Sequence, residues 1–203
     1  MAQQTSISTD QTSLLALKQH ITNDPHDLLS TNWTETTSIY NWAGITRGIT
    51  HGRVTSLNRA FMGLSGTLPP HLGSLSFLAY FNITNSTFHG SLPGELSRLR
   101  RVRYFSVRNN SFEGEIQQWF PWLPWLKYPF LNGNSFSSVI PESICNVSTL
   151  QKLDLSMNQL SGPITPLIFN ISSLKMIDLS NNQLSGSMPS FIFSRSQLQQ
   201  LIW

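Results

Sequence analysis

A single pattern of apolar and polar positions recurs along most of the chain every 24 residues. Two neighbouring copies are nearly identical, LQKLDLSMNQLSGPI at 150–164 and LKMIDLSNNQLSGSM at 174–188. Self-similarity at a fixed period of roughly 20 to 50 residues is the signature of a protein built from stacked repeats. The pattern therefore predicts a repeat architecture before any single element is considered.

Each unit has apolar residues at its first, fourth and sixth positions, as at Leu150, Leu153 and Leu155. The alternation between the last two predicts a short β-strand with one buried face. One such strand cannot bury that face alone, so neighbouring units must stack into a continuous core. We expect residues 54–203 to form six full units and the first strand of a seventh, where the chain is truncated.

An Asn follows the predicted strand in four units, and a Gly comes four residues later in three of them. We expect the Asn amide to satisfy backbone groups where the chain turns away from the strand, and the Gly to permit a tight bend. This structural Asn ladder comprises Asn110, Asn134, Asn158 and Asn182.

Several units depart from the pattern. Met62 and Ser86 stand in place of the Asn, and Ser138 stands in place of the Gly. Pro129 lies in a predicted strand, where it removes a donor from the hydrogen-bond ladder. Arg59 brings a charge to an inward position, which is costly unless its side chain bends out to solvent.

The segment before the repeats predicts a helical cap. Asp10 is a typical helix-start residue, and Leu14 and Leu17 follow at helical spacing. We expect residues 10–53 to cover the open edge of the first repeat, as terminal repeats require, and residues 1–9 to be disordered.

Composition narrows the class of protein. Charged residues make up 11 % of the chain, against about 25 % in typical domains. The net charge of +3 is spread along the chain, which argues against a nucleic-acid partner. Cys145 is the single cysteine, so no internal disulfide can form. We identify no secretory signal pattern and no apolar run long enough for a membrane segment.

The unit LxxLxLxxNxLxGxIP resembles the plant-type leucine-rich repeat, and TDQTSLLALKQHITNDPHDLLSTNWTETTSIYNWAGIT resembles the N-terminal cap of plant leucine-rich-repeat receptor kinases. The resemblance implies an α/β solenoid: a right-handed coil with a parallel concave β-sheet, a 3₁₀ or irregular convex side and an N-terminal helical cap. It also implies an extracellular, cell-surface recognition domain that is not an enzyme. Any kinase activity would belong to a longer parent chain.

The cap departs from the family at one place. The family motif reads C-x-W-x-G-[IV]-x-C and is closed by a disulfide, whereas YNWAGITR has Tyr40 and Arg47 at the two cysteine positions. A disulfide over so short a loop is usually worth about 2–3 kcal/mol. We therefore expect a looser cap.

Strand residues between the buried positions are expected to face the concave side and to form columns across the repeats. Three tyrosines share one column at a strand spacing of about 5 Å, and basic residues flank them. Tyr and Arg anchor many binding surfaces, although aromatic ladders also stabilise sheets by themselves. The predicted ligand-binding face comprises Tyr80, Arg103, Tyr104, Arg108, Lys127, Tyr128 and Lys152.

Several N-x-[ST] triplets fit a secreted glycoprotein, although repeats rich in Asn and Ser also produce them by chance. A glycan at Asn82 would lie on the concave face and compete with a ligand. The candidate N-glycosylation sites are Asn32, Asn82, Asn85, Asn109, Asn146 and Asn170.

The aromatic segment FPWLPWLKYPF at 120–130 follows Trp119. We expect it to pack between repeats on the convex side, and the alternative is an exposed patch for a partner. The histidines fall at no metal-ligand spacing, and Cys145 is predicted to be an apolar core thiol rather than a nucleophile. No catalytic residue, metal or cofactor is predicted.

The leading hypothesis is a recognition module of a plant receptor that binds a peptide, protein or pathogen-derived ligand on its concave face, with a possible co-receptor. Its role would lie in defence or development. The alternatives are a free-standing inhibitor resembling polygalacturonase inhibitors, or a truncated receptor-like decoy. An ice-binding surface would need a flat, regular Thr or Asn array, and the concave column from Asn58 to Asp178 is irregular.

Overall fold

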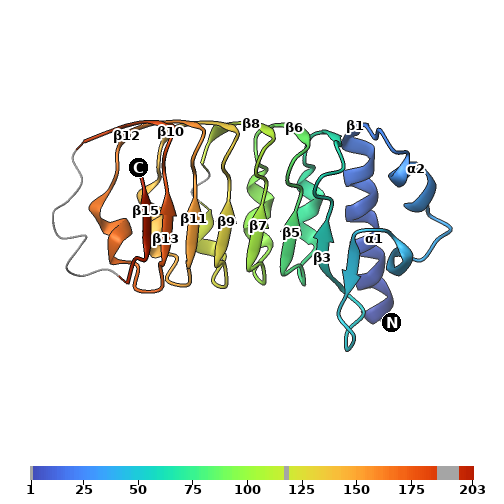
Figure 1. Ribbon diagram of the computed structural model, residues 1–203. Helices are drawn as coiled ribbons and strands as arrows, with labels where there is room; N and C mark the ends of the chain where they lie inside the picture. Colours follow the sequence, from blue (N-terminus) through green and yellow to red (C-terminus); the bar gives the residue numbers. More distant parts are fainter. Residues whose placement is uncertain (1, 117–118, 187–196) are drawn as a thin grey trace.

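The computed structural model describes residues 2–116, 119–186 and 197–203. The repeats lie side by side as narrow coils, and the N-terminal helix stands against one end of the stack (Figure 1). This arrangement confirms the predicted solenoid with a parallel sheet and short 3₁₀ segments.

One strand from each unit joins an eight-stranded sheet in the order β15-β13-β11-β9-β7-β5-β3-β2. Neighbouring strands are parallel from β3 to β15, and β2 pairs with β3 antiparallel. We call the solvent-facing side of this sheet the concave face. The strands are β2 (Ile45–Arg47), β3 (Val54–Asn58), β5 (Tyr80–Asn82), β7 (Tyr104–Ser106), β9 (Tyr128–Phe130), β11 (Lys152–Asp154), β13 (Met176–Asp178) and β15 (Gln200–Ile202).

A second sheet of seven strands runs along the adjoining side of the solenoid, and the sequence pattern did not predict it (Figure 1). Apart from β1, which belongs to the cap, its strands lie at or beside the Leu-x-Gly position of the unit, which is short and rich in Gly and Ser and so lacks the usual strand signal. The strands are β1 (Ile21–Asn23), β4 (Ser65–Gly66), β6 (Thr87–Gly90), β8 (Ser111–Glu115), β10 (Ser135–Val139), β12 (Gln159–Pro163) and β14 (Gln183–Ser185).

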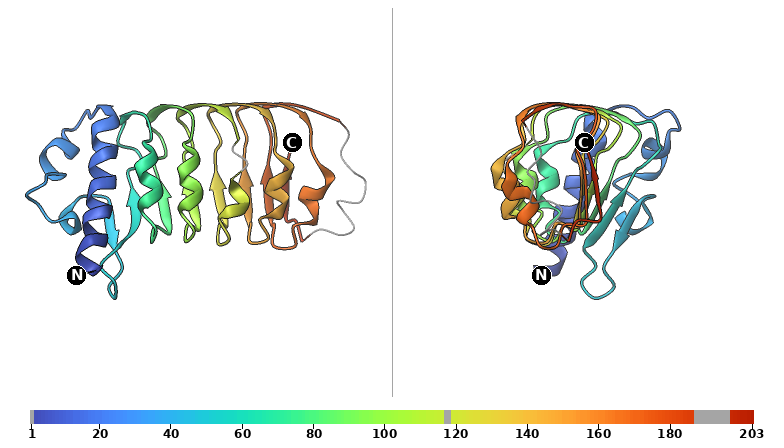
Figure 2. Two further views of the ribbon diagram at one scale, coloured as in Figure 1. Left: turned by 180° about the vertical axis from the view of Figure 1, so that it is seen from behind. Right: turned by 60° about the vertical axis from the view of Figure 1, so that its left-hand side comes forward.

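In the described coils, short helical segments lie on the side opposite the eight-stranded sheet (Figure 2). The cap contributes α1 (Ala2–His20), α2 (Leu28–Asn32) and η1 (Ile39–Asn41). The repeats contribute the 3₁₀ segments η2 (Pro70–Ser74), η3 (Gly94–Arg98), η4 (Phe120–Trp122), η5 (Glu142–Asn146) and η6 (Pro166–Asn170).

Each ladder Asn joins two neighbouring repeats through its side chain. Nδ2 of Asn134 donates to the carbonyls of Leu131 (3.0 Å) and Asn132 (3.3 Å) in its own repeat. It also donates to Val107 O of the preceding repeat, at 3.0 Å. Its Oδ1 accepts the Phe112 N–H at 3.0 Å. The same pattern recurs at Asn110, Asn158 and Asn182.

In the two units that lack the Asn, the residue in its place does not make the hydrogen bonds of the Asn side chain. The buried Ser86 Oγ has no hydrogen-bond partner, and Met62 packs its side chain against the core. Because Ser86 is too short to reach across the repeat boundary, backbone hydrogen bonds such as Thr87 N–H to Leu64 O, at 2.8 Å, link these repeats without an Asn bridge.

Pro129 weakens one strand pairing, as its missing N–H predicts. β9 and β11 pair only through Phe130 opposite Asp154. By contrast, β7–β9 and β11–β13 each pair over three residues. Pro129 itself stays buried in the strand, so the sheet continues across it with fewer hydrogen bonds.

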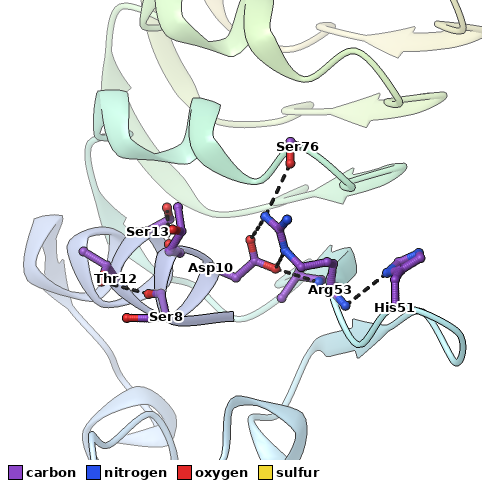
Figure 3. A network of polar contacts seen from close by, with 9 residues as sticks. Ser8, Asp10, Thr12, Ser13, His51, Arg53 and Ser76 are labelled. Atoms are coloured by element: carbon purple, nitrogen blue, oxygen red, sulfur yellow. Dashed lines mark hydrogen bonds and ion pairs between the residues drawn. The ribbon is translucent and has the colours of Figure 1, made fainter. Parts of the chain in front are cut away.

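The N-terminal helix begins earlier than predicted: it includes residues 2–9, which were expected to be disordered, and Asp10 is not its first residue, whereas residue 1 lies outside the described residues. α1 starts at Ala2, and Asp10 lies in its middle with 1 % of its surface exposed. The Asp10 carboxylate is not a helix cap, because it accepts hydrogen bonds from Arg53 Nη2 (2.7 Å), Arg53 Nε (2.9 Å) and Val54 N (2.9 Å). Figure 3 shows this two-pronged ion pair, which fastens α1 to the first repeat.

One cation–π contact links the two positions that hold the cap disulfide in plant leucine-rich-repeat receptor kinases. The Arg47 guanidinium carbon lies 4.4 Å from the centre of the Tyr40 ring. These are the two residues at the family's cysteine positions, so a noncovalent contact links the same two points. Nearby, the rings of Trp33 and Trp42 stack at 5.2 Å.

Arg59 does not bend out to solvent. Only 3 % of its surface is exposed, and its guanidinium lies 5.0 Å from the Trp33 ring centre. Burial lowers the pKa of Arg59, and the nearby Asp24 opposes that change. The charge is thus held against an aromatic face inside the cap.

Ser138 carries a backbone strain that its Gly counterparts avoid. Its φ is +73°, in the left-handed region, and Gly162 one unit later has φ +75°. We expect Ser138→Gly to raise the free energy of unfolding by about 0.5–1 kcal/mol in denaturant titration, because Gly adopts this conformation without a Cβ clash. Ser137→Gly, one residue away and outside this region, should be destabilising. Equal destabilisation by both variants would contradict the assignment of strain.

Candidate functional site

The predicted tyrosine column forms on the concave face. Tyr80, Tyr104 and Tyr128 lie opposite one another in β5, β7 and β9. The Tyr80 and Tyr104 rings stack at 4.4 Å with an interplanar angle of 9°. The Tyr104 and Tyr128 rings lie 6.4 Å apart at 49°. Stacking limits the rotamers of these rings, so they form a preorganised surface.

Phe130 and Arg108 extend this column, and Phe130 was not predicted as a site residue. The Phe130 ring meets the edge of Tyr104 at 5.5 Å and stacks on Tyr128 at 6.5 Å. The Arg108 guanidinium carbon lies 5.8 Å from the Phe130 ring centre, and its Nε has no hydrogen-bond partner. We call Tyr80, Tyr104, Tyr128, Phe130 and Arg108 the tyrosine ribbon.

Two residues of the ribbon stand where other repeats have a turn closed by side-chain hydrogen bonds. After β11, Asp154 Oδ1 accepts hydrogen bonds from Ser156 N and Ser156 Oγ. Asn82 and Asp178 make the same turn after β5 and β13. In the central repeats, Phe130 and Arg108 occupy positions of this turn. The central repeats therefore lack that turn and present a large ring and a cation instead.

Burial changes the acid–base properties of two groups on this face. It raises the pKa of the Asp154 carboxyl; the hydrogen bonds from Ser156 oppose that rise, and the neighbouring Arg108 opposes it less. Burial and the adjacent Tyr80 raise the pKa of the Tyr104 phenol, so Tyr104 stays neutral. The ribbon is thus an aromatic surface with a cation at one side.

The remaining basic residues of the predicted site do not all join the ribbon. The Arg103 guanidinium carbon instead lies 5.9 Å from the Trp125 ring centre. Lys127 is half-buried and Lys152 is exposed. Within the described residues, neither lysine forms an ion pair or a ring contact. The sequence columns could group these residues but could not give their side-chain directions.

The candidate glycosylation sites differ in how far their side chains are exposed. Asn82 is only 8 % exposed, and its amide bonds to Tyr80 Oη and Thr84, so a glycan there would break these contacts. Asn82 stays a prediction, and it is the candidate whose surroundings favour a glycan least. Asn32 is half-buried, and its side chain bonds to the backbone of Asn41 and Ala43. The exposed candidates, which stay predictions, are Asn85, Asn109, Asn146 and Asn170.

The aromatic segment at 120–130 was expected either to pack between repeats or to form an exposed patch. Each interpretation holds for some of its residues. Phe120 is buried, and Trp119 meets the edge of the Phe105 ring at 6.3 Å in the core. Trp122 and Trp125, however, are 57 % and 53 % exposed. The segment therefore packs between repeats with one set of rings and presents another set to solvent.

Other chemistry is not evident in the described part of the chain. Burial and the nearby Glu142 raise the pKa of the Cys145 thiol to about 11, which keeps it protonated. Among the described residues, no group of His, Cys, Asp or Glu could hold a metal ion. None of the described helices combines the length and apolar character needed to cross a membrane.

Comparisons with known proteins agree with this geometry. The Leucine Rich Repeat family model matches residues 149–171 and 173–194. The receptor-like kinase EFR of Arabidopsis thaliana is 32 % identical over 83 residues, which cover 41 % of this chain and 8 % of EFR. The chain thus spans only a small part of the receptor kinases that it matches.

Solved structures extend the likeness to nearly the whole chain. The crystal structure of PEPR1–AtPEP1 superposes with a TM-score of 0.89 at 29 % identity, covering 96 % of this chain and 28 % of that one. The Arabidopsis receptor kinase HAESA, solved with the peptide hormone IDA and the co-receptor SERK1, gives a TM-score of 0.87 at 29 % identity. That match covers 96 % of this chain and 33 % of HAESA.

The fold and these relatives define the class of protein. The chain folds as a solenoid like that of leucine-rich-repeat receptor ectodomains, and two of its repeats match the Leucine Rich Repeat family model. More particularly, it resembles the ectodomains of plant receptor kinases.

The raised pKa of Asp154 predicts a pH-dependent stability. The folded protein holds this proton more tightly than the unfolded chain, so stability falls as pH rises from about 4 through the folded-state value. We expect Asp154→Asn to be more stable than the parent at neutral pH, because Asn makes the same turn at position 82 without a charge. The difference should vanish below about pH 4 in denaturant titrations.

The reverse substitution is the matched control. Asn82→Asp should lose stability at neutral pH and recover it in acid. A pH-independent difference for both variants would show that burial of the carboxylate is not the cause.

Proposed function

We propose that this chain is the ligand-recognition part of a plant cell-surface receptor and that it binds an extended peptide along the tyrosine ribbon. The observation that carries this proposal is the row of tyrosine rings in contact across three neighbouring strands, one pair stacked and one tilted, with Arg108 at its side. Tyr and Arg supply large contact areas and hydrogen bonds at low entropy cost when they are already ordered.

The geometry suits an elongated ligand better than a compact one. The ribbon crosses the strands at their spacing of about 4.8 Å, so it extends along the solenoid axis. The half-buried rings offer both an apolar face and a phenol, and Tyr128 Oη already donates to Gln151 Oε1 at 2.7 Å. A peptide can place apolar side chains on the rings and an acidic side chain against Arg108.

The relatives support this function and its location. PEPR1 was solved with AtPEP1, and HAESA was solved with the peptide hormone IDA and the co-receptor SERK1. By analogy, we propose an extracellular site of action and a peptide or protein ligand, with a co-receptor as a further partner. The exposed N-x-[ST] triplets fit such a location.

Selection from a displayed random-peptide library tests the role of the ribbon. Peptides selected on the parent protein should lose about tenfold or more of their affinity for Tyr104→Ala/Arg108→Ala, because these residue types are typical binding hot spots. The melting temperature should change little, since both side chains are partly exposed.

Leu167→Ala provides the control, since Leu167 is an exposed apolar residue of η6 on the opposite side. It should leave peptide affinity unchanged. If the selected peptides bind the parent and the double variant equally well, the ribbon is not the recognition surface.

A further inference from the structure

A basic cleft lies beside the tyrosine ribbon, at the edge where the strands of the eight-stranded sheet begin. Its volume is about 460 Å³, and its lining includes His51, Phe77, Arg101, Arg103 and Trp125. We call these five residues the arginine cleft. Arg103 immediately precedes β7, so the cleft adjoins the ribbon but comprises different side chains.

Aromatic rings hold the two cleft arginines in place. The Arg101 guanidinium carbon lies 3.9 Å from the centre of the Phe77 ring, and that of Arg103 lies 5.9 Å from the centre of the Trp125 ring. Such contacts orient a guanidinium without using its N–H donors. Both arginines can therefore offer those donors to a ligand.

The charges of these arginines are not neutralised by a neighbouring carboxylate. Arg53, which also lies on Phe77, is paired with Asp10. Within the described residues that is the one ion pair formed, and no Asp or Glu lines the cleft. The cleft thus presents two ordered cations to solvent.

His51 adds a third donor at the same place. Its ring lies 4.2 Å from Phe77, and its Nδ1 accepts the Arg53 N–H at 3.1 Å (Figure 3). Because Nδ1 is an acceptor, the neutral ring carries its proton on Nε2. Two guanidinium groups and one imidazole N–H around a single cleft are complementary to an oxyanion.

An exposed pair of tryptophans narrows the chemistry of the ligand. Trp125 and Trp122 each expose more than half of their surface, and each has an arginine over its ring. Arg100 lies 5.6 Å from the Trp122 ring centre and donates to Trp122 O at 3.1 Å. The chain thus carries two ring–cation pairs, each a flat apolar face beside a guanidinium, whose tryptophans are three residues apart in sequence.

A polymer whose own units combine a ring face with an anion matches these two pairs. We propose that the arginine cleft, together with Arg100 and Trp122, binds an acidic polysaccharide built of uronic acids. The carboxylates pair with Arg101 and Arg103, and the apolar face of a pyranose ring rests on Trp125. An acidic peptide carries carboxylates too, but it lacks a ring face at every unit.

Titration calorimetry with oligogalacturonate as the probe tests this proposal. The parent protein should bind it, and binding should weaken with added salt and vanish for the methyl-esterified, uncharged oligomer. Arg101→Gln/Arg103→Gln should lose roughly tenfold or more, the scale of one or two charge-assisted hydrogen bonds. Trp125→Leu should lose several-fold with the charges intact.

Matched variants make each result decisive. Arg98→Gln removes an exposed arginine of η3 outside the cleft and should bind like the parent. If the double variant does not fold, Arg101→Lys replaces it, because Lys keeps the charge and loses the planar fork; affinity equal to the parent's would then overturn the proposal. Equal binding by the folded double variant would also overturn it.

Two further arms separate the alternatives. Polyglutamate that binds as tightly as oligogalacturonate, with the same dependence on Trp125, would assign the cleft to acidic peptides and contradict the proposal. Binding that ignores Trp125→Leu would show a general polyanion effect and would also contradict it. The ribbon variant Tyr104→Ala/Arg108→Ala should keep its affinity for oligogalacturonate, so failure at the cleft and failure of the peptide function remain distinguishable.

Discussion

The amide of one Asn in each ladder repeat holds that repeat in register with the preceding one, and the rest of the structure depends on that link. At Asn134, Nδ2 reaches carbonyls in two repeats and Oδ1 accepts the Phe112 N–H. All of these groups lie where the chain leaves one sheet and enters the other, so they have no partner within either ladder. A buried amide that satisfies them at every repeat makes any other register costly.

Because the register is fixed, equivalent residues of successive repeats line up and form continuous surfaces. Tyr80, Tyr104 and Tyr128 are 24 residues apart in sequence, and they become neighbours because their strands pair residue for residue. The same register places Phe130 and Arg108 at positions where other repeats keep an Asp–Ser or Asn–Thr turn. The proposed recognition surface therefore lies where repeats depart from the pattern while their neighbours keep the stack intact.

The inner strands, the tyrosine column and the Asn positions follow from the period, because alternation and repetition act on every unit alike. The second sheet could not be predicted from the alternation of apolar and polar residues, because its Gly- and Ser-rich strands gain their stability from pairing across repeats. Asp10 resembled a helix cap, but its distant partner Arg53 is invisible to local reasoning. For the same reason sequence could not show that Arg59 stays buried, or that Phe77, Arg101 and Trp125 meet in one cleft. Phe77, Arg101 and Trp125 each directly precede the first apolar residue of a repeat, so a column drawn at that position would have grouped them.

Hydrogen exchange at the four amides that donate to Asn side chains tests the central claim most directly. These are the N–H groups of Phe88, Phe112, Phe136 and Leu160. If the Asn bridges hold the repeats in register, these amides should exchange only when the whole stack unfolds. Exchange at the rate of exposed loop amides, while the inner strands stay protected, would contradict the account.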